Sequence, residues 1–132
     1  MFLNMLQKKD KENFLKLAHY MARSDSNFSN EQKEIIATYC YEMQIDDIDF
    51  DSLDFNLEET LKEVTDKLAQ KIMLLEIMAL VYSDDILHNE EAKVIDKMVA
   101  VFGLDKNIAK LYQEWTKNIL AVTKQGELLL EL

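Results

Sequence analysis

A run of alternating aspartates is the densest group of acidic side chains in the sequence. Four acids occupy the first, third, fifth and twelfth positions of a calcium-binding EF-hand loop: Asp47, Asp49, Asp51 and Glu58. The sixth position, where that loop turns on a glycine, is Ser52, and the eighth, normally apolar, is Asp54. The pattern therefore predicts a weak calcium loop at best, and an exposed acidic loop is the alternative.

Two further groups of acids share the pattern S-D-x-x-x-x-N-E, at Ser24–Glu31 and Ser83–Glu90. Calcium and magnesium bind clustered oxygen ligands, and zinc also accepts carboxylates, so clustered carboxylates predict a divalent-cation site or a surface for a protein partner. The acids proposed for this role are Asp25, Glu31, Asp84, Asp85, Glu90 and Glu91. The alternative is that Ser and Asp end one helix while Asn and Glu begin the next.

The two acidic stretches belong to a longer internal repeat. Segments 14–45 and 73–104 align without gaps, and six of their 32 positions are identical. The identities cluster in the loop, whereas most apolar positions change to another apolar type. The repeat pairs Ile36 with Ile95, and we expect both to be buried, because core positions of equivalent helices face the same interior.

Composition and spacing both indicate long helices joined by polar loops. The chain has no proline and two glycines, and tight turns draw on these residues. We expect one all-α domain over residues 1–132, a compact bundle of about six to seven helices with two repeated hairpins and the apolar helix near 72–82 at its centre. The expected starts of three helices are the capping residues Ser29, Asn56 and Asp105.

The final helix has apolar residues at helical spacing, which predicts one face against the bundle. That predicted face consists of Ile108, Leu111, Tyr112, Trp115, Ile119 and Val122. The tail Glu127–Leu132 either packs back on the core or stays loose.

Charge and cysteine content restrict the classes of function. The net charge is −10, which repels nucleic acid and anionic membranes. The apolar start Met1–Leu6 has no basic segment before it and no cleavage site, so it does not read as a signal peptide, and no apolar run is long enough to span a membrane. With one cysteine, Cys40, an internal disulfide is excluded. We expect a cytoplasmic protein without membrane insertion.

The remaining reactive side chains give little sign of catalysis. Cys40 lies on an apolar stripe and is expected to be an inert core thiol. His19 has no polar partner nearby in sequence and is expected to be structural or half exposed. His88, beside Glu90 and Glu91, predicts either a mixed zinc site or an exposed residue at a helix start. Because no hydrolase, phosphate-loop or zinc-protease motif is present, we expect a protein that is not an enzyme.

The repeated loops resemble a known family. An apolar helix, the pattern A-D-G-x-x-s-x-x-E and a second amphipathic helix recur in the tellurite-resistance TerB-like domain. In this chain the pattern corresponds to Arg23–Gln32 and Tyr82–Glu91. Where the family has glycine after the aspartate, the chain has Ser26 and Asp85, and Gln32 takes the place of the later glutamate in the first copy.

The resemblance implies an all-α, non-catalytic, stress-associated module with an acidic surface that binds divalent cations, here calcium, magnesium or zinc. The predicted function is therefore cation binding, protein-partner binding, or both, through the acidic loops. A protein-interaction or scaffold domain without metal is the alternative. The sequence identifies neither the partner nor the oligomeric state.

Overall fold

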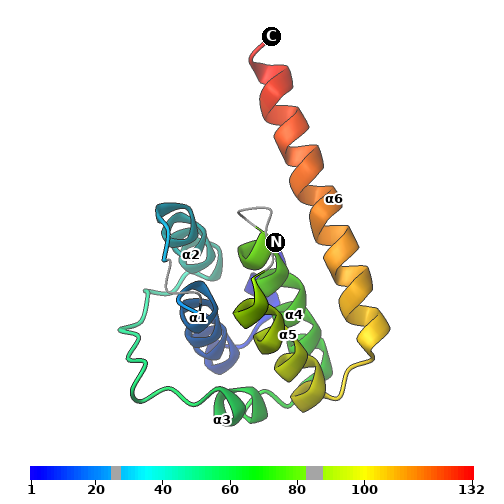
Figure 1. Cartoon of the computed structure of the whole chain (residues 1–132). Helices are drawn as coiled ribbons and strands as arrows, with labels where there is room; N and C mark the ends of the chain where they lie inside the picture. The colour runs from blue at the N-terminus through cyan, green and yellow to red at the C-terminus, as the bar shows by residue number, and fades with distance from the viewer. Residues whose placement is uncertain (25–27, 83–87) are drawn as a thin grey trace.

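The structure is a computed structural model that describes residues 1–24, 28–82 and 88–132. Throughout these residues every regular element is a helix, which confirms the predicted all-α class (Figure 1). A short 3-10 helix precedes six α-helices: η1 (Leu3–Met5), α1 (Lys8–Ala22), α2 (Asn30–Met43), α3 (Leu57–Lys62), α4 (Lys67–Val81), α5 (Asn89–Phe102) and α6 (Lys106–Leu130).

The helix bounds reproduce the internal repeat. The bounds of α4 and α5 are those of α1 and α2 shifted by 59 residues. The residues that follow α2 and α5, Gln44 and Gly103, share the left-handed conformation, with φ of 57° and 65°. Ile36 and Ile95 are 2% and 7% exposed, so the expected burial of both is confirmed. We refer to α1 with α2 as the first hairpin and α4 with α5 as the second hairpin.

The helices begin where the capping residues predict. The Ser29 hydroxyl accepts a hydrogen bond from the Gln32 amide at 3.1 Å, and the Gln32 side chain accepts one from the Ser29 amide at 3.2 Å, a reciprocal capping box. Asn56 caps α3 through the Glu59 amide at 2.9 Å. Asp105 caps α6. Each side chain supplies an acceptor to an amide that has no partner within the first turn.

Helix α4 lies at the centre of the core, as its nearly all-round apolar sequence predicts. It packs against α1, α5, α6 and η1, while α3 closes one end between α1 and α5. Phe14 of α1 meets Tyr39 of α2 edge to face, with ring centroids 5.1 Å apart, and the Tyr39 hydroxyl donates to the Glu76 carbonyl of α4 at 2.9 Å. The two hairpins are thus joined in a shared interior. No helix in the described part of the chain is long and apolar enough to cross a bilayer.

Two expectations for the C-terminal helix are wrong. The tail is neither loose nor folded back, because α6 continues through it to Leu130, past Gly126, and extends beyond the other helices (Figure 1). Leu111, Trp115 and Val122 are 68%, 38% and 63% exposed, although the apolar stripe placed them against the bundle. Within α6, Thr116 alone is buried. The bundle covers one side of this helix, so an apolar stripe wider than that side stays partly in solvent.

The N-terminal segment is held by two acidic side chains. The Phe2 amide donates to Glu76 Oε1 at 2.7 Å, and the Leu3 amide donates to Glu42 Oε2 at 3.1 Å. Leu3 is completely buried. The carboxylates of α2 and α4 therefore accept from amides of η1 that would otherwise be unpaired near the core.

Candidate functional site

The predicted acids of the repeated loops occupy different environments. Asp25, Asp84 and Asp85 lie outside the described residues. Glu31 and Glu90 are exposed in the first turns of α2 and α5, where the helix dipole stabilises a negative charge. Glu90 accepts from the Lys93 ammonium at 3.1 Å. Cation binding by this group stays a prediction.

Glu91 has a local structural role that its repeat partner shares. Its side chain is 1% exposed, and Glu91 Oε1 accepts from the His88 amide at 3.2 Å. Gln32, the equivalent residue of the first hairpin, makes the same contact with Ser29. Carboxylate and amide oxygens both serve as this acceptor, which accounts for Gln replacing Glu between the copies. The capping contact therefore accounts for a side-chain oxygen acceptor at this position in both copies.

Three of the four acids of the EF-hand-like loop make separate interactions, and the fourth, Asp49, is exposed. Asp47 accepts from the His19 ring at 2.7 Å, and Asp51 accepts from the Leu53 amide at 2.9 Å. Glu58 lies 3.7 Å from the Lys62 ammonium and 3.5 Å from that of Lys97. In the described residues, no three His, Cys, Asp or Glu side chains converge closely enough to hold a metal ion.

Of the two alternatives expected for His19, the structural one holds, because the residue is buried and has polar partners on both sides of its ring. The side chain donates from Nε2 to Asp47 Oδ1 at 2.7 Å, and Nδ1 lies 2.6 Å from an Arg23 guanidinium nitrogen. A guanidinium can only donate, so Nδ1 must accept and the proton must reside on Nε2. The ring stacks on Phe50 with centroids 5.8 Å apart. Asp47 and Phe50 are 28 or more residues away in sequence, and local spacing gives no signal of them.

Asp47 also affects the pKa of the Cys40 thiol. This thiol is half buried, and burial together with the charge and hydrogen bond of Asp47 raises its pKa to about 11. The thiolate is the nucleophilic form, so we expect Cys40 to react weakly near neutral pH. Cys40 lies at the edge of the core, whereas its apolar stripe had predicted a place inside it, and its inertness stays a prediction.

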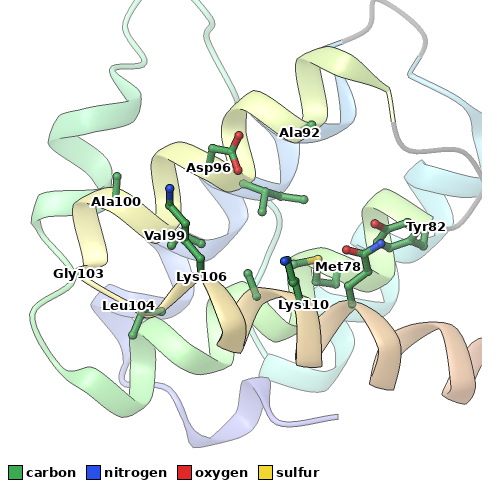
Figure 2. A pocket seen from close by; sticks show the side chains of 13 residues that line it. Met78, Tyr82, Ala92, Asp96, Val99, Ala100, Gly103, Leu104, Lys106 and Lys110 are labelled. Carbon is green, nitrogen blue, oxygen red and sulfur yellow. The ribbon is translucent and has the colours of Figure 1, made fainter.

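An open groove lies between α5 and α6 on the second hairpin (Figure 2). Both helices pack on α4, and in the described residues they make few contacts with each other. The groove has a volume of about 760 Å³. Met78 of α4, Tyr82 at the C-terminal end of α4 and Val99 of α5 form its floor. The sequence did not predict this groove, because it forms where α5 and α6 both pack on α4.

The walls of the groove combine small residues with charged ends. The small residues are Ala92, Ala100, Gly103 and Ala109. Asp96 lies on the α5 side, and Lys106 and Lys110 lie on the α6 side (Figure 2). Burial, with Glu114 and Glu91 adding to it, raises the pKa of Tyr82, so its hydroxyl stays protonated at neutral pH. Apolar contact area with a few polar groups around it is typical of a site that binds a ligand or a peptide.

Helix α6, like α1, carries a net positive charge in an acidic protein. It contains four lysines and two glutamates, a net charge of +2, whereas the chain as a whole carries −10. Lys110, Lys117 and Lys124 recur every seven residues, which places them along one side of the helix. Lys117 and Lys124 line a second hollow that also includes Tyr82. Basic charge therefore follows the same side of α6 from the groove outward.

Comparison with known proteins gives no relative: no family model, no curated protein and no solved structure matches the chain.

Proposed function

We propose that this chain is a non-catalytic protein-interaction module that binds a short segment of a partner protein in the groove between α5 and α6. This is the metal-free alternative drawn from the sequence, now assigned to a specific surface. The observation that supports it is an open apolar groove with small residues along its walls and lysines at its edge. The resemblance to TerB-like domains, and the stress association that it implies, remain predictions.

The dimensions of the groove favour a short segment. Its α5 wall extends from Ala92 to Gly103, which corresponds to about 16 Å at a rise of about 1.5 Å per residue. An extended chain covers that distance with about five residues. Small wall residues let a peptide backbone approach closely, and the floor residues supply apolar contact.

The test is a peptide selection with a groove-blocked variant. Linear peptides from a random display library are selected on the purified protein, and their dissociation constants are measured by fluorescence anisotropy. Ala100→Tyr places a large side chain in the groove wall and should weaken binding by tenfold or more. The substitution gives position 100 of the second hairpin a tyrosine, the residue type that the first hairpin has at the equivalent position, Tyr41.

The matched control is Ala37→Tyr, which adds the same side chain at an exposed position of α2. This variant should bind the selected peptides as wild type does. A selection that yields no specific binder, or binders that Ala100→Tyr leaves unchanged, would overturn the proposed function. Amide chemical-shift changes in the NMR spectrum should concentrate on the groove residues.

A further inference from the structure

The internal repeat contains a filled counterpart of the open groove. Shifted by 59 residues, the floor residues Met78, Tyr82 and Val99 correspond to His19, Arg23 and Cys40 of the first hairpin. His19 is buried and Cys40 is half buried beside the chain's own following segment, whereas Arg23 is exposed. Asp47 accepts from His19, and its hydrogen bond and charge act on Cys40.

Phe50 completes the cover over the first hairpin. Its ring stacks on His19 with an interplanar angle of 10°, and the Arg23 guanidinium lies 5.1 Å from its centroid. The covering residues belong to the stretch Asp46-Asp47-Ile48-Asp49-Phe50, which has no regular secondary structure. These five residues, three acids and two with apolar side chains, thus lie over the outer surface of the first hairpin.

The second hairpin is covered by a helix instead of an irregular segment, because the chain after Gly103 forms α6 almost at once and α6 packs on α4. The groove lies beside α6, and its floor residues Met78 and Val99 are 2% and 7% exposed. The cationic groups also change position. In the first hairpin the Arg23 guanidinium lies over the Phe50 ring of the acidic segment, whereas the equivalent residue of the second hairpin is Tyr82. Positive charge is supplied instead from the side, by Lys106 and Lys110 of α6.

We infer that the partner segment of the proposed groove is acidic and carries apolar anchors, an extended stretch of the kind D-x-I-D-F that the first hairpin binds within the same chain. Resting on the proposed function, this inference adds the chemistry of the ligand and its orientation. Carboxylates of the segment lie toward Lys106 and Lys110, and its apolar side chains lie over Met78 and Val99. The lone acid Asp96 on the opposite wall disfavours the reversed placement, since like charges repel.

The probe is a synthetic peptide with the sequence of residues 44–55, compared with a version in which its aspartates are asparagines. Binding to the full chain is measured by anisotropy at low and at physiological salt, and the site is mapped by NMR. We expect the acidic peptide to bind the groove at least tenfold more tightly than the amide version. Added salt should reduce that difference, because the lysines at the groove edge are exposed.

Charge reversal identifies the lysines involved. Lys106→Glu with Lys110→Glu should weaken acidic-peptide binding by tenfold or more, while Lys33→Glu, at the exposed α2 position equivalent to Ala92, should change it less than twofold. Library peptides that occupy the groove but ignore both charge changes would overturn this inference and leave the proposed function standing. If no peptide occupies the groove, both fail. Shifts confined to His19, Arg23 and Cys40 would show exchange with the chain's own segment and would also overturn the inference.

Discussion

The two hairpins have the same helix lengths, and each ends in a residue with the left-handed conformation, but their surroundings differ. The first is covered by residues 46–50, through the contacts of Asp47 and Phe50 with α1. The second is flanked by α6, which leaves a groove open over α4. The hydrophobic pattern of each repeat determines the hairpin, and the segment that follows determines whether its outer surface is used internally or remains free for a partner.

The largest effect expected is in the shared core. Ile36→Ala and Ile95→Ala should each lower the free energy of unfolding by about 2–5 kcal/mol, because each leaves a cavity among packed side chains. Urea denaturation measures the change. Similar values would show that the repeat-equivalent positions contribute equally to one cooperative unit. A cost below about 1 kcal/mol at either site would contradict equivalent packing.

Thermal melting with cations tests the acidic loops and compares the two copies. If Asp84 is a ligand, millimolar calcium, magnesium or zinc should raise the melting temperature of the wild type, and Asp84→Asn should abolish the rise. A ligand present at ten times its dissociation constant adds about 1.4 kcal/mol to stability. Because the second copy has more acids, Asp25→Asn should have the smaller effect. Asparagine caps a helix as well as aspartate. A wild-type melting temperature that does not change with these cations would therefore leave capping as the explanation.

Alkylation of Cys40 tests the covering segment of the first hairpin. Its raised pKa, about 11, means that the protonated thiol persists to higher pH than an ordinary cysteine and that the rate should keep rising between pH 8 and pH 11. Asp47→Asn removes the nearby charge, lowers the pKa and should speed iodoacetamide modification at pH 9 by about tenfold, which corresponds to about 1.4 kcal/mol. Asp46→Asn is the control, because Asp46 raises this pKa least. Equal rates for the two variants would contradict the contact.

The smallest expected change in stability concerns the residues that end the two hairpins, Gln44 and Gly103. Gln44 adopts a left-handed conformation that favours glycine, so Gln44→Gly should stabilise the fold by up to about 1 kcal/mol. Gly103→Ala should destabilise it by a similar amount. A new Cβ at Gly103 would meet only the Lys67 ammonium, at 3.7 Å, so strain rather than a clash causes the loss. Thermal denaturation of both variants measures the pair, and changes of the same sign would contradict this account.

Local features of the fold could be predicted from sequence, and long-range ones could not. The caps at Ser29 and Asn56 depend on side chains within three residues, so their residue types predict them. Gln44 gives no such signal, because its conformation follows from the turn that ends α2 and not from its own preference. The His19–Asp47 contact joins residues 28 positions apart. Periodicity identified the apolar stripe of α6, but it does not say which side of a helix the bundle covers.

The contacts of the N-terminal segment also depend on both hairpins. Phe2 and Leu3 precede every α-helix in sequence, yet their amides donate to Glu76 of α4 and to Glu42 of α2. Because one acceptor belongs to each hairpin, the segment makes both contacts only when the two hairpins are packed together. The same dependence makes it a reporter. In native-state hydrogen exchange, the Phe2 and Leu3 amides should lose protection whenever the hairpins separate, whichever of the two opens first.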